Sequence, residues 1–466
     1  MIVYNNIESG ITDVYLGNKS IAQVYIGSHL VWPIEPPSTQ MKLMFTTDED
    51  EKASFDCSHT GKTLQTSTAY PSYALTDSEV LDLAYDNGMS GKTVTSITIG
   101  NCTEEIVSNA FSFRYDYSNK NYKSIENIKN FNMGNGVKKV GVFAFSGGYG
   151  DNKWYTNLTG FTLSNKLETI GNFAFFGLRS VRSFKLPDSL KTIGSSAFTQ
   201  CSSAEFTFGD NIESIGSYAF KNCQRIRTIK IPNTTTSVGT SAFMNCSGAT
   251  VLSIGSGLET INDSTFQNCS NLNRIDVPDN VQYIKNSVFS GCTSASAATI
   301  GRGCREIGSN LFNGCTNLQN VVFANGSATS TIGDYTFNGC KNLTSITFSN
   351  TLDSIGAYTF HDCIKLTEVV YPDSVYSIGS NQFYNNYSVK SITIGSGCRI
   401  IGGNDGIFGC TSYTCKATTP PTLNGSLSFG EGVDYKIYVP SESVENYKNA
   451  NGWSKHADHI FPISNH

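Results

Sequence analysis

The sequence predicts a repeat solenoid, mainly β with short turns or helical corners, because one frame recurs along most of the chain. The frame is an aliphatic residue, two polar residues, Ile, Gly, three variable residues, Phe, two more residues and Cys, as in LKTIGSSAFTQC at Leu190–Cys201. A fixed period in the twenties indicates units that bury their apolar faces only by stacking. The repeat Phe recurs mostly every 23 residues, at Phe175, Phe198, Phe220, Phe243, Phe266, Phe289, Phe312, Phe337, Phe360, Phe383 and Phe408, with looser copies at Phe111 and Phe145.

This frame resembles the BspA-type leucine-rich repeat, a family found in bacterial surface adhesins and in proteins of phages that infect gut bacteria. The resemblance covers roughly residues 95 to 463, and its motif recurs in register at least eleven times. It implies a leucine-rich repeat solenoid of about 13 repeats with a closing cap at its carboxyl end.

The chain divides by composition into five parts. We expect a small β adaptor at 1–32, a Pro-rich linker at 33–39, an N-terminal cap at 40–92, the repeat solenoid at 93–416 and a C-terminal cap at 417–466. A cap is expected at each end because the terminal turns of a solenoid otherwise expose their apolar faces. A short helix is expected in the first cap, from Thr76 or Asp77 to Tyr85.

The first 32 residues contain a short duplication with alternating β-branched and aromatic residues, which predicts a hairpin-like module. The segment ITDVYLGNKSIAQVYIGSHLVWP also resembles the amino-terminal heads of structural proteins from phages and prophages of gut bacteria. That resemblance implies an adaptor that attaches a display domain to a particle. The candidate anchoring residues are Val14, Tyr15, Leu16, Val24, Tyr25, Ile26 and Trp32.

Two early repeats are longer than the others, and both insertions follow the repeat Phe directly, at Phe111 and Phe145. Insertions in a repeat array map to surface loops and often to the binding face. Aromatic and basic side chains there suit a recognition patch, including stacking on sugar rings, although the same aromatics equally suit local cover of the edge. The candidate ligand-binding residues are Arg114, Tyr115, Tyr117, Tyr122, Lys153, Trp154 and Tyr155.

Each later repeat carries a short strand whose middle residue should point outward, because side chains alternate along a strand. Such a face suits a broad contact with a glycan or a neighbouring subunit. The expected outward ladder is small and mostly uncharged: Lys185, Thr207, Lys230, Ser253, Asp276, Thr299, Val322, Thr347, Val370 and Thr393.

Eight of the 14 cysteines stand three residues after the repeat Phe, which predicts a column of buried free thiols with one thiol per turn. The column comprises Cys201, Cys223, Cys246, Cys269, Cys292, Cys315, Cys340 and Cys363. The Gly of the Ile-Gly corner, for example Gly194 or Gly216, is expected to take a positive φ. In the closing cap, Ser441 is the expected N-cap of a helix with Val444, Tyr447 and Ala450 on one face.

Composition argues against several classes of function. Charged residues make up 15% and the net charge is −5, so the clustered basic residues of a nucleic-acid binder are missing. No apolar run is long enough to cross a bilayer, and the amino terminus predicts no signal peptide. No phosphate loop, nucleophile elbow or zinc-protease motif occurs, and His456 with His459 lacks further ligands for a metal. We therefore expect no cofactor, no metal and no enzyme.

Three functions stay open. The leading prediction is a virion structural protein of tail-fibre or head-fibre type, assembled in the host cytoplasm, with the head bound to other virion proteins and the rod displayed for contact with a host-surface glycan or protein. A homo-oligomer in the particle is expected. The alternative is a bacterial cell-surface adhesin of the same repeat family. The third is a glycan hydrolase, which requires paired carboxylates that meet in space.

Overall fold

The computed structural model describes residues 128–147, 157–403 and 405–463, with the shorter pieces 94–99, 105–106, 108 and 110–111 before them. Between residues 14 and 58 it gives the backbone of short strands. The chain forms two compact units, Met1–Ile226 (unit 1) and Arg227–His466 (unit 2). The boundary between these units falls inside the predicted repeat region and does not coincide with any boundary of the five predicted parts. The five-part division of the chain therefore stays a prediction.

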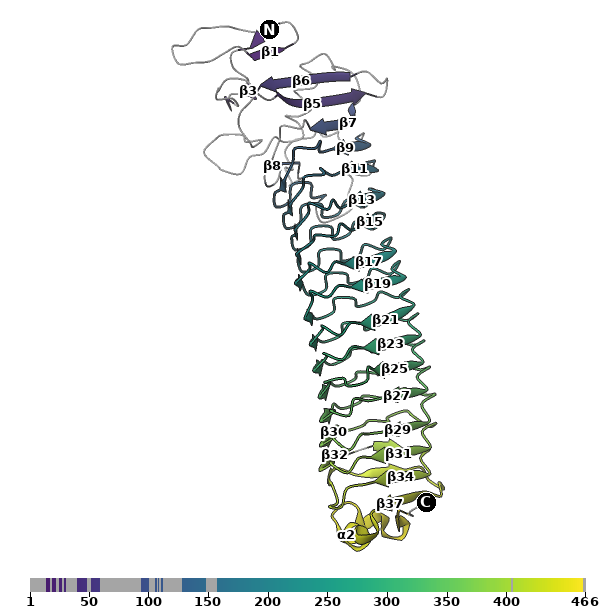
Figure 1. Cartoon of the computed structure of the whole chain (residues 1–466). Helices are drawn as coiled ribbons and strands as arrows, with labels where there is room; N and C mark the ends of the chain where they lie inside the picture. Colours follow the sequence, from purple (N-terminus) through teal and green to yellow (C-terminus); the bar gives the residue numbers. More distant parts are fainter. Residues whose placement is uncertain are drawn as a thin grey trace. The chain divides into compact units, whose positions relative to one another are not determined.

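Each unit is built as a parallel β-solenoid with little helix, which confirms the predicted fold class. Most turns contribute one longer strand and one shorter strand of two or three residues, and the two kinds form separate ladders. In unit 2 the longer strands, such as β29 and β31, lie on the opposite side from β30 and β32 (Figure 1). The core lies between these two ladders.

In unit 1 the two ladders are parallel and pair in register from turn to turn. The longer strands are β7 (Val94–Ile99), β9 (Asn130–Asn132), β11 (Gly160–Thr162), β13 (Ser183–Lys185) and β15 (Glu205–Thr207). The shorter strands are β8 (Glu105–Ile106), β10 (Lys139–Val140), β12 (Thr169–Ile170), β14 (Thr192–Ile193) and β16 (Ser214–Ile215).

Unit 2 repeats the same arrangement. Its longer strands are β17 (Thr228–Ile231), β19 (Val251–Ile254), β21 (Arg274–Val277), β23 (Ala297–Ile300), β25 (Asn320–Phe323), β27 (Ser345–Thr347), β29 (Glu368–Val370), β31 (Ser391–Ile394), β34 (Ser412–Cys415), β37 (Lys436–Val439) and β38 (Ile460–Pro462). Its shorter strands are β18 (Ser237–Val238), β20 (Thr260–Ile261), β22 (Tyr283–Ile284), β24 (Glu306–Ile307), β26 (Thr331–Ile332), β28 (Ser354–Ile355), β30 (Ser377–Ile378), β32 (Ile400–Gly402) and β35 (Thr422–Asn424). A separate pair is formed by β33 (Asp405–Ile407) and β36 (Leu427–Phe429).

The strand pattern follows from alternation of side chains. In β13, Phe184 is buried while Ser183 and Lys185 are exposed, and β21 alternates in the same way. The repeat Phe residues stack across the turns, with ring centroids 5.5 Å apart between Phe266 and Phe289. Because each buried Phe contacts its counterparts in the adjacent turns, the apolar core extends along the stack.

Before the repeats, the backbone forms antiparallel pairs. Strands β1 (Val14–Leu16) and β2 (Lys19–Ile21) pair, as do β3 (Tyr25–Ile26) and β4 (His29–Leu30). The longer hairpin of β5 (Gln40–Thr47) and β6 (Lys52–Ser58) adds to the sheet of unit 1 through antiparallel pairing of β5 with β7. The expected helix from Thr76 or Asp77 to Tyr85 lies outside the described residues.

The carboxyl end of unit 2 is closed by the 3₁₀ helix η3 (Ser441–Ser443), the helix α2 (Val444–Asn449) and the 3₁₀ helix η4 (Ser454–His459). Tyr447 and Trp453 are fully buried, and their polar atoms donate hydrogen bonds to the Ala417 carbonyl at 2.7 Å and the Pro421 carbonyl at 2.9 Å. The predicted N-cap was wrong. Ser441 begins η3, and α2 starts after Ser443, whose hydroxyl donates to the Thr418 carbonyl instead of capping the helix.

The corner glycines correct a second expectation, because the φ angles of Gly194 and Gly216 are not positive. A Cβ added at Gly216 would lie 2.4 Å from the Ser195 nitrogen and 2.6 Å from the Gly194 carbonyl carbon, in the backbone of the preceding turn. Glycine is therefore required by the close approach of stacked corners. The positive φ falls two residues later, at 54° for Ser196 and 60° for Tyr218.

Candidate functional site

The candidate ligand-binding residues of the two insertions all lie outside the described residues: Arg114, Tyr115, Tyr117, Tyr122, Lys153, Trp154 and Tyr155. Their role stays a prediction. Of the anchoring candidates, Val14, Tyr15 and Leu16 form the backbone of β1, and Tyr25 with Ile26 forms β3. Val24 and Trp32 lie outside the described residues.

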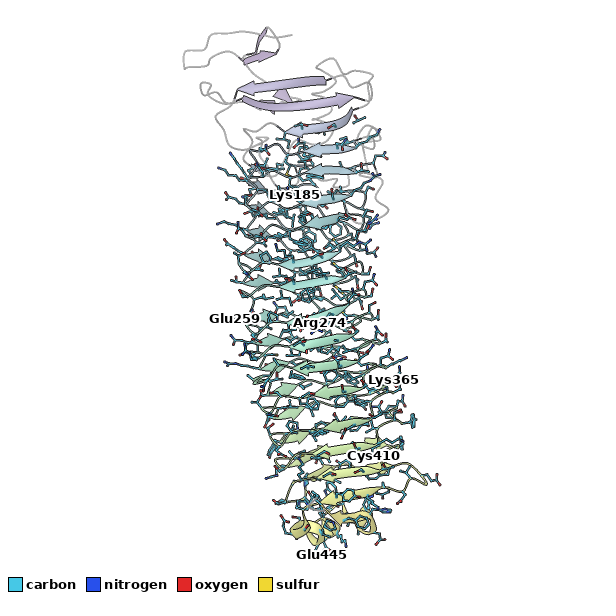
Figure 2. The ribbon with its side chains drawn as sticks, turned by 45° about the vertical axis from the view of Figure 1, so that its right-hand side comes forward. Lys185, Glu259, Arg274, Lys365, Cys410 and Glu445 are labelled. Carbon is cyan, nitrogen blue, oxygen red and sulfur yellow. The ribbon has the colours of Figure 1, made fainter. Side chains whose placement is uncertain are left out.

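The longer strands of unit 2 present the outward ladder on one surface, which we call the sheet face. Thr299 of β23, Val322 of β25 and Thr347 of β27 are register partners on adjacent strands. Figure 2 shows Arg274 on this face, between an edge marked by Glu259 and an edge marked by Lys365. The predicted outward positions therefore share one surface within unit 2.

The sheet face combines small polar groups with exposed aliphatic ones. Val251, Val322 and Val370 keep 52%, 44% and 48% of their surface exposed. Its charges are partly paired, since the Arg274 Nε donates to both Asp276 carboxylate oxygens at 2.7 and 2.9 Å. This surface offers packing and hydrogen bonding over many turns.

The thiol column is buried as predicted, and the eight cysteines are fully inaccessible. The Cys269 thiol donates to the carbonyl of Phe243, the repeat Phe one turn earlier, at 3.3 Å, and the Cys315 thiol donates in the same way to Phe289 at 3.1 Å. Burial raises the pKa of both thiols to about 12. A protonated, enclosed thiol is neither a nucleophile nor a metal ligand, so the column is structural.

In the next repeat the position of the column Cys is occupied by Asn386, which stands three residues after Phe383. Its Nδ2 donates to the Phe360 carbonyl at 2.6 Å, in the place of the thiol. Its Oδ1 is buried without a hydrogen-bond partner. A buried orphan acceptor costs about 1–3 kcal/mol, so this turn is a weak point of the core.

Unit 2 also carries a cluster of aromatic side chains that the sequence analysis did not single out. This aromatic edge consists of Tyr335, Tyr358, His361, Tyr384, Tyr387 and Phe408. Tyr335 stacks on Tyr358 with centroids 4.8 Å apart and planes within 2°, and His361 stacks on Tyr384 at 5.3 Å. The sequence does contain a sign of this cluster, because DYTF at 334–337 and AYTF at 357–360 place Tyr at the same position of two successive repeats.

The histidines of the C-terminal cap are held by one tyrosine. His456 Nδ1 lies 2.8 Å from the Tyr435 hydroxyl, and His459 Nδ1 lies 3.0 Å from the Tyr435 carbonyl oxygen. Desolvation lowers the pKa of His456. Within the described part of the chain, no cluster of three or more His, Cys, Asp or Glu side chains has the geometry to bind a metal ion, and no helix there is long and apolar enough to cross a membrane.

Two parallel ladders joined by corners, with one repeat per turn, define a leucine-rich repeat solenoid. The BspA type leucine rich repeat region, in six copies, matches residues 153–252, 236–331 and 330–431, which together make up more than half of the chain. The chain therefore belongs to the BspA-type leucine-rich repeat family.

Solved structures of leucine-rich repeat proteins are similar to this chain, and one of them has a TM-score above 0.5. A leucine-rich repeat protein from Bacteroides ovatus superposes with a TM-score of 0.54 at 19% identity, covering 80% of this chain and 95% of that one. The pneumococcal vaccine antigen PcpA gives a TM-score of 0.42 at 18% identity, covering 78% of this chain and 84% of its own. A leucine rich cell surface protein from Faecalibacterium prausnitzii gives 0.37 at 20% identity, covering 66% and 86%. A search of curated protein sequences returned no match.

Proposed function

We propose that this chain is a non-enzymatic, adhesin-like repeat protein that works at a bacterial cell surface and uses the sheet face of its repeats for contact with a macromolecule. The observation that carries the proposal is the sheet face of unit 2, on which successive turns present Ser, Thr and Val side chains in register. Membership of the BspA-type family supports the surface role.

The chemistry of the sheet face favours binding over catalysis. Most of its outward groups are hydroxyl and aliphatic, which do not exchange protons near neutral pH. The one carboxylate of the outward ladder, Asp276, is paired with Arg274, so the ladder presents no pair of carboxylates for hydrolysis. A broad surface of weak contacts gains affinity by summing over many turns, and its apolar members gain most from removal of water. The exposed valines are the positions where we expect that gain.

A second candidate is the virion protein of tail-fibre or head-fibre type, with the head as its attachment point. The observation that favours it is the segment ITDVYLGNKSIAQVYIGSHLVWP, whose backbone forms the two small hairpins β1–β2 and β3–β4. A module of this size needs a larger surface to dock on. The virion role rests on this head alone, whereas the surface role rests on the repeats that make up most of the chain.

Cell binding tests the leading proposal. The purified, fluorescently labelled chain should bind intact bacterial or epithelial cells saturably in flow cytometry. A sheet-face variant, Ser253→Glu with Val322→Glu and Val370→Glu, should bind about tenfold more weakly, because three unpaired charges would have to be desolvated in the contact.

The matched control places the same charges at exposed corners, as Ser256→Glu, Asn325→Glu and Ser396→Glu. It should bind like the unmodified chain. Equal binding by the sheet-face variant and the control would contradict the role of the sheet face. Absence of saturable binding to any cell type, together with incorporation into phage particles that is lost on deletion of residues 1–33, would favour the virion function instead.

A further inference from the structure

We propose that the aromatic edge of unit 2 is a second binding site, and that its ligand is an uncharged, extended polysaccharide of β-linked sugars. This inference goes beyond the sheet face and does not depend on it. Most of the edge residues lie in the segments that lead from a shorter strand to the next longer strand, whereas the sheet face is formed by the longer strands themselves.

The first argument is the cost of placing tyrosine on this edge. The backbone is left-handed two residues before each repeat Phe from Phe145 to Phe383, and Ser264 and Ser287 adopt this conformation at φ of 55° and 57°. Tyr335 and Tyr358 occupy the same position at 56° and 55°. A bulky residue in this region is rare and strained, whereas a small polar residue tolerates it. Since other turns fold with serine, the tyrosines are not needed for the corner.

The second argument is preorganisation. The rings form a connected series, in which Tyr358 contacts His361 edge to face at 6.2 Å and His361 stacks on Tyr384. In the same region Tyr387 stacks on Phe408 at 5.9 Å. The neighbouring rings restrict each side chain, yet Tyr384 and Tyr387 keep 49% and 63% of their surface exposed. Rings fixed before binding lose little side-chain entropy when a ligand stacks on them.

The third argument is the chemistry of the edge. Tyrosine offers an apolar ring with a hydroxyl, which matches the alternation of C–H faces and hydroxyls on a sugar. His361 Nδ1 pairs with the Asn338 side-chain oxygen, so polar groups continue beside the rings. Formal charges balance, because the segments 334–341 and 358–365 each contain one Asp and one Lys. A surface whose positive and negative charges balance does not attract an acidic polysaccharide, so we assign an uncharged polysaccharide as the ligand.

The fourth argument is spacing. Residues of successive turns are separated by the distance between paired strands, about 4.8 Å. An extended β-linked chain of pyranoses advances by a similar distance for each sugar. A polysaccharide that runs along the stack therefore meets equivalent groups on each turn, and its contacts add over the turns that carry aromatic residues.

The test is binding of the full-length chain to insoluble neutral polysaccharides, with cellulose, chitin and β-mannan as probes. The edge variant combines Tyr335→Ser, Tyr358→Ser, Tyr384→Asn and Tyr387→Ser. These are residues that other repeats carry at the same positions, for example Ser264, Asn338 and Ser270. The fold should therefore survive, as circular dichroism would verify. The control is the sheet-face variant with Glu at 253, 322 and 370.

The unmodified chain and the sheet-face variant should bind at least one of the three polymers, and the edge variant should bind it about tenfold more weakly or not at all. If the edge variant loses its fold, the single change Tyr387→Ser at the most exposed ring should still weaken binding severalfold. Retention of binding by the edge variant would overturn the proposal.

If the unmodified chain bound none of the three polymers, the proposal would also be overturned. If sedimentation then showed self-association that the edge variant abolishes, the occupant would be a second copy of the chain. Failure of the sheet-face proposal is recognised separately, because it concerns cell binding by the sheet-face variant.

Discussion

In unit 1 the core position of the longer strand carries Phe at four successive turns, as Phe131, Phe161, Phe184 and Phe206, whereas unit 2 carries Ile229, Leu252, Ile275, Ala298 and Val321 at that position. The strand rings of unit 1 pack edge to face against the repeat Phe rings, at 5.2 Å between Phe161 and Phe175. In unit 2 the repeat Phe rings stack on one another, and aliphatic strand residues fill the space beside them.

The comparison shows that one frame accepts two core chemistries. Stacked repeat rings lie 5.0 Å apart between Phe175 and Phe198 in unit 1, and 5.9 Å apart between Phe289 and Phe312 in unit 2. What both cores share is the corner, whose glycine is set by backbone contact between turns. Side chains inside a turn can therefore be exchanged more freely than the residues that fix the turn spacing.

The largest effect is expected from removal of a repeat ring. Phe175→Ala in unit 1 should cost about 5 kcal/mol of unfolding free energy, and Phe289→Ala in unit 2 about 3 kcal/mol. The difference arises because Phe175 contacts four rings, Phe145, Phe161, Phe184 and Phe198, whereas Phe289 contacts the two rings Phe266 and Phe312. Urea unfolding followed by circular dichroism measures both, and equal losses would refute the comparison.

The next effect concerns the shared corner. Gly216→Ala in unit 1 and Gly333→Ala in unit 2 should each cost about 3 kcal/mol, because an added Cβ would lie 2.4 Å from the Ser195 nitrogen or 2.5 Å from the Ser309 nitrogen. Gly314→Asn is the control, since an added Cβ there meets nothing within 4 Å and Asn222 has a similar positive φ. The same urea experiment should show a loss below about 1 kcal/mol for it. Unequal costs at the two corners would show that the turn spacing differs between the units.

The thiol column predicts a dependence on pH. The pKa of Cys269 and Cys315 is raised from 9.0 to about 12, so the folded state keeps its protons where the unfolded chain releases them. Their contribution to stability is complete below pH 9 and falls as the pH rises from 9 toward 12. Pulsed alkylation with peptide mapping should leave these thiols unmodified at pH 8 and label them progressively above pH 9. Rapid labelling at pH 8 without urea would contradict their burial.

The smallest effect is expected at the exception in the column. Asn386→Cys should raise the unfolding free energy by about 1 kcal/mol, because it removes the unpartnered Oδ1 from the core. The reverse change, Cys363→Asn, should lower stability by about 2 kcal/mol for the same reason. Thermal unfolding of the two variants and of the unmodified chain measures both changes in stability. A loss of stability in Asn386→Cys would mean that the amide hydrogen bond to Phe360 outweighs the orphan acceptor.

Most of the fold was predictable because the repeat is a local pattern. The Phe spacing predicted the stacking and the Cys position predicted the buried column, since equivalent positions of successive turns have similar surroundings. Phe408 is the exception, with 39% of its surface exposed. Two local expectations failed for a reason that sequence does not contain. The positive φ was assigned to Gly194 by residue type, but it falls on Ser196. The cap helix was expected to begin after Ser441, but it begins after Ser443, whose hydroxyl donates to the Thr418 carbonyl of a distant segment.

The aromatic edge is a candidate site that could not be predicted from the sequence. Tyr358 and His361 belong to one turn and Tyr384 to the next, so only stacking brings their rings together.

The sequence by itself determined the period, the family, the composition of the core and the outward ladder, because these depend on spacing along the chain. The tertiary structure decided which glycines are irreplaceable, where the core leaves an acceptor without a partner, and which exposed rings meet. These depend on distances between turns, which are set when backbone hydrogen bonds fix one turn against the next.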